Sequence, residues 1–310
     1  MPNLTLNFRP DSLGAGTPVN IYLPDEIVED MPVLYLLHGM HGDHNSWMNG
    51  SAIGRYARAL KIAVIMPSVG NSFYCNMKYG GRYHDYVAIE LPEYIGKLLP
   101  FITKKREKTF IAGLSMGGYG AVKLALRNPD KFSACASLSG ALDMNVDVKA
   151  GDPGWLTIVK SIWGEDYETA LPGSEDDILH LLKNFPDDKP KPRIYAACGT
   201  SDFLYEQNQT FRRAIAETEF EFKYEEGPGA HTWDFWDKWI IPALKCLTAE
   251  IEQYGVSRFA RMIMYLPSAN VDSDFSAYAS IFLRKTVRAA RFGEMKGEFP
   301  LCGNFRIIKR

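Results

Sequence analysis

Ser115 stands among closely spaced glycines in the stretch FIAGLSMGGYGAVKLALRNP, residues 110–129. An apolar run typical of a buried strand precedes this serine, and a helical pattern that ends before Pro129 follows it. Gly113 and Gly117 complete a G-x-S-x-G pattern in this strand–turn–helix context, which predicts a tight turn that displays a nucleophilic serine. The alternative is a glycine-rich turn that merely contains a serine.

A serine hydroxyl is a poor nucleophile, so this prediction requires a general base and an acid that orients the base. The turn after the apolar run RIYAA carries Asp202, and the Gly-Pro-Gly loop after FEFKYEE carries His231. Both lie where predicted strands end, in the chain order Ser, Asp, His that such triads follow. The competing interpretations are that Asp202 only caps the next helix and that His231 is an exposed loop residue.

A tetrahedral oxyanion needs two N–H donors. We expect one from the backbone amide of Met116, at the start of the helix after the serine. The other is assigned to Met40, with Gly39 as the next choice, in the loop HGMHG that follows the buried run VLYLL.

Three histidines of this loop, His38, His41 and His44, raise the alternative of a zinc site. Their spacing is not the helical H-E-x-x-H pattern, and no carboxylate motif accompanies them. We therefore expect no metal and no other cofactor. His38 is expected to pack and hydrogen-bond so that the loop keeps its shape.

Strand-like and helix-like segments alternate along the chain, which predicts an α/β fold with a mainly parallel sheet covered on both faces. The first two strands have no helix between them and are expected to form an antiparallel edge. The expected strands are residues 4–8, 19–23, 33–37, 63–67, 109–113, 134–138, 193–197 and 220–225. The expected helices are residues 51–60, 85–99, 117–127, 205–218 and 232–254.

Two segments depart from this alternation. Residues 143–192 are rich in Asp, Gly and Pro, with helical pieces at 155–163 and 176–184, and an insertion of this size predicts a small cap. Residues 255–310 include a basic amphipathic helix at 275–292 and form an extension of unknown role. A peripheral appendage is the first interpretation of this extension, with membrane-surface binding or dimerisation as the alternative. Residues 1–254 are then the catalytic domain.

Composition limits the partners and the location. A formal net charge of −2 is not the basic balance that nucleic-acid-binding proteins have. The basic run KKREK at residues 104–108 is expected to be a solvated loop. No apolar run approaches the length of a membrane span. The five cysteines are scattered and include no C-x-x-C pair, which indicates that they are reduced thiols. We therefore expect a cytoplasmic protein without a disulfide framework. Self-association into a homo-oligomer stays open.

In these motifs the sequence resembles the α/β-hydrolase branch that contains S-formylglutathione hydrolase (esterase D), bacterial tributyrin esterases and feruloyl or acetyl-xylan esterases. The resemblance runs from about Val19 to Leu247 and is closest to the tributyrin-esterase type. It covers, in family order, VNIYLP, LLHGMHGDHNSW, PSVGNSFYCNM, GLSMGGYGA, CGTSDFLY and GAHTWDFWDKWI. It implies a Ser115, Asp202 and His231 triad with Met40 and Met116 as oxyanion donors. The loop HGMHG departs from the SGLTC typical of the formylglutathione enzymes, and residues after about 255 match nothing in the family.

The resulting expectation is a serine esterase that acts on short-chain acyl esters, such as carbohydrate acetyl or feruloyl esters, through an acyl-enzyme. Six residues that flank the motifs are expected to bind substrate: Trp47, Phe73, Tyr74, Phe203, Leu204 and Trp233. Ordinary core packing is the alternative for each of them. The rival functions are an S-formylglutathione hydrolase, an acyltransferase, and a non-catalytic binding module on a hydrolase fold.

Overall fold

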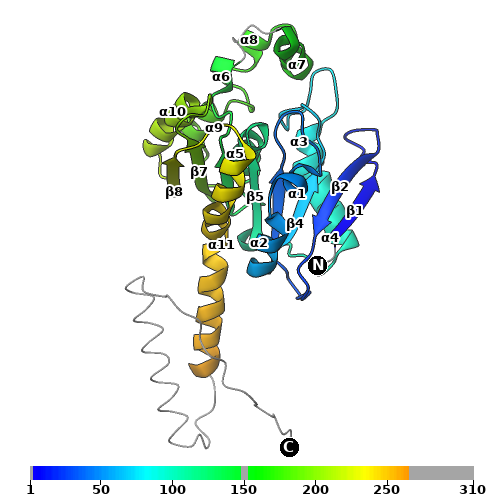
Figure 1. The fold of residues 1–310 in the computed structure, drawn as a ribbon, viewed down its shortest axis with the longest axis vertical. Helices are drawn as coiled ribbons and strands as arrows, with labels where there is room; N and C mark the ends of the chain where they lie inside the picture. Colours follow the sequence, from blue (N-terminus) through cyan, green and yellow to red (C-terminus); the bar gives the residue numbers. More distant parts are fainter. Residues whose placement is uncertain (1–2, 148–152, 265–310) are drawn as a thin grey trace, which may run out of the picture. The chain divides into compact units, whose positions relative to one another are not determined.

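The computed structural model describes residues 3–147 and 153–264, and one mixed sheet organises it (Figure 1). The strands lie in the order β1-β2-β4-β3-β5-β6-β7-β8. Neighbouring strands from β4 to β8 pair in parallel, whereas β2 pairs antiparallel with both β1 and β4. The expected antiparallel edge is therefore confirmed. The strands are Asn3–Phe8, Thr17–Tyr22, Val33–Leu37, Ala63–Pro67, Thr109–Leu114, Ala134–Leu138, Arg193–Gly199 and Phe222–Gly227 for β1 to β8.

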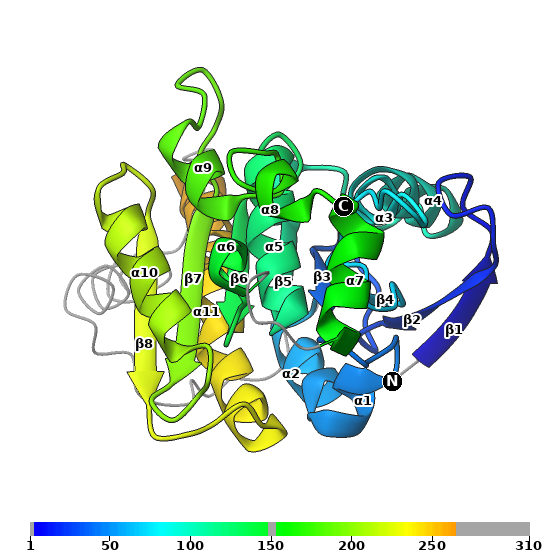
Figure 2. The same cartoon turned by 90° about the horizontal axis from the view of Figure 1, so that it is seen from above.

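Helices cover both faces of the sheet (Figure 2). One face carries α1 (Ser46–Gly50), α2 (Ile53–Leu60) and the first part of α11 (Trp233–Met264), up to Leu247. The other carries α3 (Tyr83–Asp85), a π-helix (Tyr86–Glu90), α4 (Leu91–Leu98), α5 (Met116–Arg127) and α10 (Tyr205–Ala216). A short 3₁₀-helix, Arg106–Lys108, precedes β5.

Alternate residues of the central strands belong to two separate apolar cores. In β3, Leu34 and Leu36 pack with the first group of helices, and Tyr35 and Leu37 pack with the second. Because successive strand side chains point to opposite faces, a continuous apolar run such as VLYLL is what a sheet buried on both sides requires. The sheet thus becomes a rigid support for the loops at the carboxyl ends of its strands.

The insertion between β6 and β7 forms a group of short helices, which we call the cap, and most of them lie above the sheet in Figure 1. They are α6 (Met144–Asp147), α7 (Pro153–Trp163), α8 (Tyr167–Ala170) and α9 (Ile178–Lys183). The two helical pieces expected here correspond to α7 and α9. The long helix α11 runs ten residues past its expected end at residue 254, to Met264.

The chain divides into two units, Met1–Gly255 and Val256–Arg310. The amphipathic helix expected at 275–292 lies outside the described residues. Within the described part, no helix combines the length and apolarity that crossing a membrane would need.

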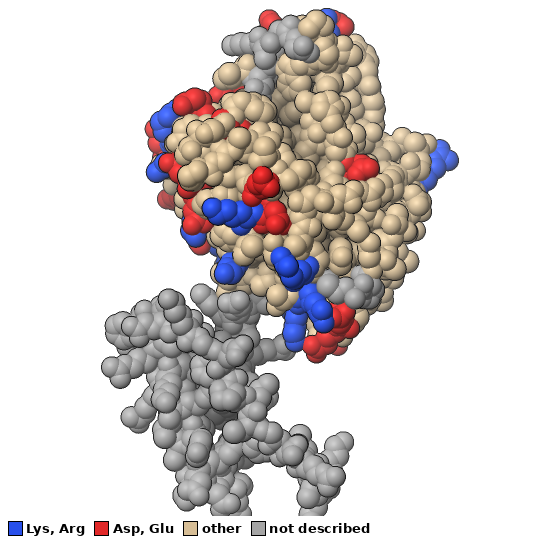
Figure 3. Space-filling model, in the orientation of Figure 1, with Lys and Arg blue, Asp and Glu red and all other residues tan. Residues whose placement is uncertain are grey.

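Surface charge is mixed on the face shown in Figure 3, where basic and acidic side chains intersperse. In the basic run at 104–108, Lys105 and Lys108 both pair with the Asp30 carboxylate at 2.8 Å. That pairing fits the expectation of a solvated loop rather than a nucleic-acid site.

Candidate active site

The serine turn has the strained backbone that its glycines suggest. Ser115 lies between β5 and α5 with φ 54° and ψ −120°, a conformation that non-glycine residues rarely adopt. A Cβ atom on Gly113 would lie 2.3 Å from the Gly117 carbonyl oxygen, and one on Gly117 would lie 2.5 Å from the Leu37 carbonyl oxygen. The two glycines are therefore required by close backbone contact, and the turn projects Ser115 at the carboxyl edge of the sheet.

His231 and Asp202 lie beside this serine in a continuous chain of hydrogen bonds. The Nε2 atom of His231 is 2.9 Å from Ser115 Oγ. The Nδ1 atom of His231 is 3.0 Å and 2.9 Å from the two carboxylate oxygens of Asp202. The Ser201 amide donates to the Gly229 carbonyl at 2.9 Å, which ties the loop of Asp202 to the loop of His231. The three residues that the sequence singles out are brought together.

Asp202 has a fully buried side chain and remains ionised. Burial raises its pKa, but the hydrogen bonds from His231 and from the Leu204 amide outweigh burial, so the pKa lies below its ordinary value. The Leu204 amide donates to Asp202 at 2.9 Å, which holds the carboxylate in its own loop while it contacts His231. The N-cap residue of α10 is Leu204, and no side chain among the described residues caps this helix, so the capping interpretation of Asp202 is wrong.

The loop after β3 passes directly behind Ser115. A Cβ atom on Gly39 would lie 2.6 Å from Leu114 Cδ1 and 3.3 Å from Ser115 Cβ, so only glycine fits comfortably. Met40 and Met116 line the same cavity as Ser115. Among the described residues, neither of their backbone amides has a hydrogen-bond acceptor, which leaves both N–H groups available to a bound group.

His38 holds this loop through both of its ring nitrogens. The Val69 amide donates to His38 Nε2 at 3.1 Å, and His38 Nδ1 lies 2.7 Å from the Gly39 carbonyl oxygen. Burial lowers the pKa of His38, which favours the neutral ring that this arrangement needs. Across the described residues, no cluster of three His, Cys, Asp or Glu side chains is suited to a metal ion.

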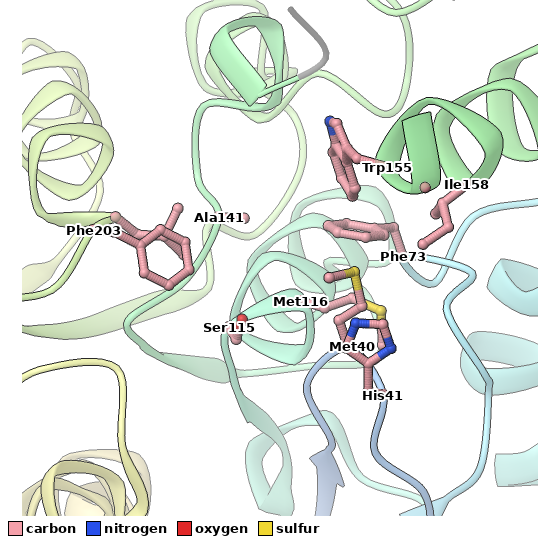
Figure 4. A pocket seen from close by; sticks show the side chains of 11 residues that line it. Met40, His41, Phe73, Ser115, Met116, Ala141, Trp155, Ile158 and Phe203 are labelled. Atoms are coloured by element: carbon pink, nitrogen blue, oxygen red, sulfur yellow. The ribbon is translucent and has the colours of Figure 1, made fainter. Parts of the chain in front are cut away.

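A cavity of about 500 Å³ opens above Ser115 (Figure 4). Three of the six expected substrate residues, Phe73, Phe203 and Leu204, line it. Phe203 is 75% exposed, and its ring centroid lies 4.5 Å from that of His231. Figure 4 places Phe203 on one side of Ser115, and Phe73, Met40 and Met116 on the other.

The other three expected substrate residues do not line this cavity. Trp47 is buried beneath the site, donates to the Leu37 carbonyl at 2.9 Å and packs against Trp233. Trp233 also covers Gly50, where any side chain would collide with its ring. Tyr74 is fully buried and donates to the His38 carbonyl at 2.9 Å. Core packing, the alternative for each of these residues, accounts for all three.

Sequence reasoning missed the part of the cavity wall that comes from the cap. Gly154, Trp155 and Ile158 of α7 line the cavity, together with His41 and Ala141. The Trp155 ring packs edge-on against Phe73 with a centroid distance of 5.4 Å. The only signal in the sequence was the cap itself, because nothing in the α7 pattern shows which face turns toward Ser115.

Comparisons with known proteins agree with this arrangement. The family described as "Putative esterase" matches residues 11–247. An acetyl esterase of Caldicellulosiruptor saccharolyticus is 33% identical over 267 residues, which cover 80% of this chain and 98% of the relative.

Two solved structures from Staphylococcus aureus are also similar. The fluorophosphonate-binding serine hydrolase FphF has a TM-score of 0.73 and 34% identity, covering 79% of this chain and 98% of its own. An S-formylglutathione hydrolase, FrmB, has a TM-score of 0.70 and 33% identity with the same coverage.

Proposed function

The chain belongs to the esterase family, has its α/β-hydrolase fold and is a serine carboxylic ester hydrolase; from this premise we propose that it cleaves short-chain acyl esters through an acyl-enzyme on Ser115. The observation that carries the proposal is the 2.9 Å contact between Ser115 Oγ and His231 Nε2, with Asp202 at the far side of the imidazole.

The first half-reaction forms the acyl-enzyme. His231 Nε2 takes the proton of Ser115 as Oγ forms a bond to the ester carbonyl carbon, which gives a tetrahedral oxyanion. Collapse of this intermediate breaks the bond to the alcohol oxygen, and His231 gives its proton to that oxygen. Asp202 keeps the other imidazole proton on Nδ1 and balances the transient positive charge.

The second half-reaction releases the acid. Water gives a proton to His231 and attacks the acyl carbon, and the collapse returns the proton to Ser115 Oγ. In both steps the backbone amides of Met40 and Met116 are assigned to the oxyanion, where each donor contributes about 3 kcal/mol of transition-state stabilisation.

The cavity supports a small uncharged ester as the substrate. Its lining is dominated by apolar side chains, among them Met40, Phe73 and Trp155. The similar acetyl esterase of Caldicellulosiruptor saccharolyticus supports a short acyl group. Apolar walls bind the acyl chain by burying it, and the volume of about 500 Å³ admits groups larger than acetyl.

A glutathione thioester is the second candidate, because FrmB is similar along most of the chain. Glutathione carries two carboxylates, which a binding site usually pairs with Lys or Arg side chains. Within the described residues, the cavity lining contains no Lys or Arg, and His41 is its one titratable side chain. The site therefore favours an uncharged ester over this thioester.

The test compares hydrolysis of p-nitrophenyl acetate and butyrate by wild type and Ser115→Ala, with S-formylglutathione and methyl ferulate in parallel. We expect kcat for the simple esters to fall by about 10⁴-fold or more in the variant. A fluorophosphonate probe should add its mass to wild type and not to Ser115→Ala.

The matched control is Ser201→Ala, which removes an exposed serine beside Asp202 and should behave as wild type. Retained turnover or labelling in Ser115→Ala would rule out this serine as the nucleophile. A wild type that binds esters without hydrolysing them would point to a binding module, and a higher kcat/KM for S-formylglutathione would select the thioesterase.

A further inference from the structure

A charged lysine is completely buried in the helix that follows the nucleophile. Lys123 of α5 is 0% exposed, and its Nζ lies 2.9 Å from Asp176 Oδ1, 2.8 Å from Cys75 Sγ and 3.2 Å from the Phe73 carbonyl oxygen. These three contacts match the three N–H groups of an ammonium ion. Full pairing is what allows such a charge to be buried.

Stability alone does not explain this ion pair. Replacing a buried pair by apolar residues of similar volume is often neutral or stabilising, because desolvation offsets the attraction between the charges. Lys123 lies between Val122 and Leu124 on a helix that is almost entirely buried. What the charged pair adds is a fixed geometry for the groups it contacts.

The first of those groups is the turn that places Phe73 in the cavity. Phe73 and Tyr74 have φ values of 50° and 54°, a left-handed pair that costs on the order of 1 kcal/mol or more per residue. Lys123 and the Cys75 thiol both donate to the Phe73 carbonyl oxygen, which holds this turn in place. The Phe73 ring then lines the cavity and packs on Trp155 of the cap.

The second group is the cap. Asp176 Oδ2 accepts a hydrogen bond of 3.0 Å from the indole nitrogen of Trp163, the last residue of α7. The Asp176 carbonyl oxygen accepts a second bond, of 2.6 Å, from the Tyr119 hydroxyl on α5. The same helix α7 carries Trp155, which lines the cavity next to Phe73.

We propose that Lys123 and Asp176 are a buried positioning pair that determines which acyl groups the site accepts. The pair joins the Phe73 turn to the end of α7 and so fixes the wall between Phe73 and Trp155. Figure 4 places this wall on the same side of Ser115 as Met40 and Met116, where the acyl chain would extend. This inference rests on the proposed ester hydrolysis at Ser115.

The test is an acyl-length series of p-nitrophenyl acetate, butyrate and hexanoate with wild type, Lys123→Met and Asp176→Asn. An acetyl group is too short to depend on the wall, whereas a hexanoyl chain must pack against it. We expect KM for hexanoate to rise at least about tenfold more than KM for acetate, since one or two misplaced methylene contacts change selectivity by that much. The ratio of kcat values should change far less than the ratio of KM values.

The matched control is Lys160→Met, which removes a solvent-exposed ion pair with Glu165 from the same cap helix. It should retain the wild-type profile. If Lys123→Met fails to fold, Trp163→Phe keeps an aromatic ring but removes the N–H donor to Asp176, and it should shift the profile in the same direction.

An unchanged acyl-length profile in the folded variants would overturn the positioning role. An equal loss of kcat for every ester would also overturn it, since that result describes a general structural defect. If the wild type has no esterase activity, the proposed function is wrong, and this inference, which rests on it, is wrong as well. An active wild type whose variants keep its selectivity contradicts this inference alone.

Discussion

The Nδ1 atom of His38 lies 2.7 Å from the carbonyl oxygen of Gly39, its own neighbour in the chain, while Nε2 accepts from the Val69 amide at 3.1 Å. The Val69 contact places the ring proton on Nδ1, where it donates to Gly39. One neutral imidazole therefore joins the β3 loop to the loop after β4. It also fixes the peptide that precedes Met40, the proposed oxyanion donor.

Replacing His38 should weaken catalysis through the backbone it holds. His38→Leu loses both hydrogen bonds, and we expect kcat for p-nitrophenyl acetate to fall about 100-fold, the typical effect of losing one oxyanion donor. His38→Asn can still donate to the Gly39 carbonyl and should lose less. Equal activity in the two variants would show that this hydrogen bond does not position the loop; thermal melts verify that both are folded.

Gly39→Ala should damage the site by steric contact alone. The added methyl group would meet Leu114 Cδ1 at 2.6 Å and Ser115 Cβ at 3.3 Å, so the loop must move away from the serine. We expect kcat to fall by about 10- to 100-fold, again as a displaced oxyanion donor. Gly16→Ala is the control, since its methyl group would meet nothing within 4 Å. Wild-type rates in Gly39→Ala would remove this loop from the mechanism.

Asp202→Asn should keep the arrangement of the active-site residues but lose most of the catalytic rate. An amide can donate to His231 Nδ1 and thereby favour the wrong tautomer, so kcat should fall about 10⁴-fold with little change in KM. Asp234→Asn, in the first turn of α11, tests whether the loss of any nearby carboxylate has this effect and should behave as wild type. A loss of less than tenfold in Asp202→Asn would argue against the proposed triad.

Phe203→Ala should weaken substrate binding rather than the chemical step. Its ring is 75% exposed beside His231 in the free protein, so the aromatic leaving group of a p-nitrophenyl ester can cover it. Burying that surface contributes about 1 to 2 kcal/mol, which predicts a rise in KM of about 5- to 30-fold with kcat nearly constant. Tyr79→Ala removes an aromatic ring that is 63% exposed and is absent from the cavity lining, and it should leave KM unchanged. An unchanged KM in Phe203→Ala would place the substrate on the other side of Ser115.

The sequence predicts a site residue when its position follows from a nearby motif, and it fails when that position depends on a contact between distant segments. Ser115, Asp202 and His231 follow strand ends, and the carboxyl ends of parallel strands meet at one edge of the sheet, so their proximity follows from chain order. Trp155 reaches the cavity only because α7 is tied down by Trp163 and Asp176, a tertiary contact with no pattern of its own. Trp47 is adjacent to a motif in the sequence but is buried in the core, because a tryptophan near a motif can pack in the core as readily as it can line the site.

Acid should destabilise the fold through His84 before the active-site carboxylate is protonated. Burial, with the nearby Arg127 charge, lowers the pKa of His84 from 6.5 to about 4, against the opposing effect of Asp85. Between these pH values the unfolded chain binds more protons than the folded one, so the free energy of unfolding falls as pH falls from 6.5 toward 4. The full effect is about 3 kcal/mol for this single group.

Denaturant unfolding at pH 7 and pH 4.5 measures this loss in wild type and in His84→Gln. The variant cannot take up the proton, so its free energy of unfolding should fall less between the two pH values. His180→Gln, which removes an exposed histidine on α9, should show the full wild-type loss. An identical pH dependence in wild type and His84→Gln would mean that the acid sensitivity arises from other groups, because only the difference between the two proteins reports the buried imidazole.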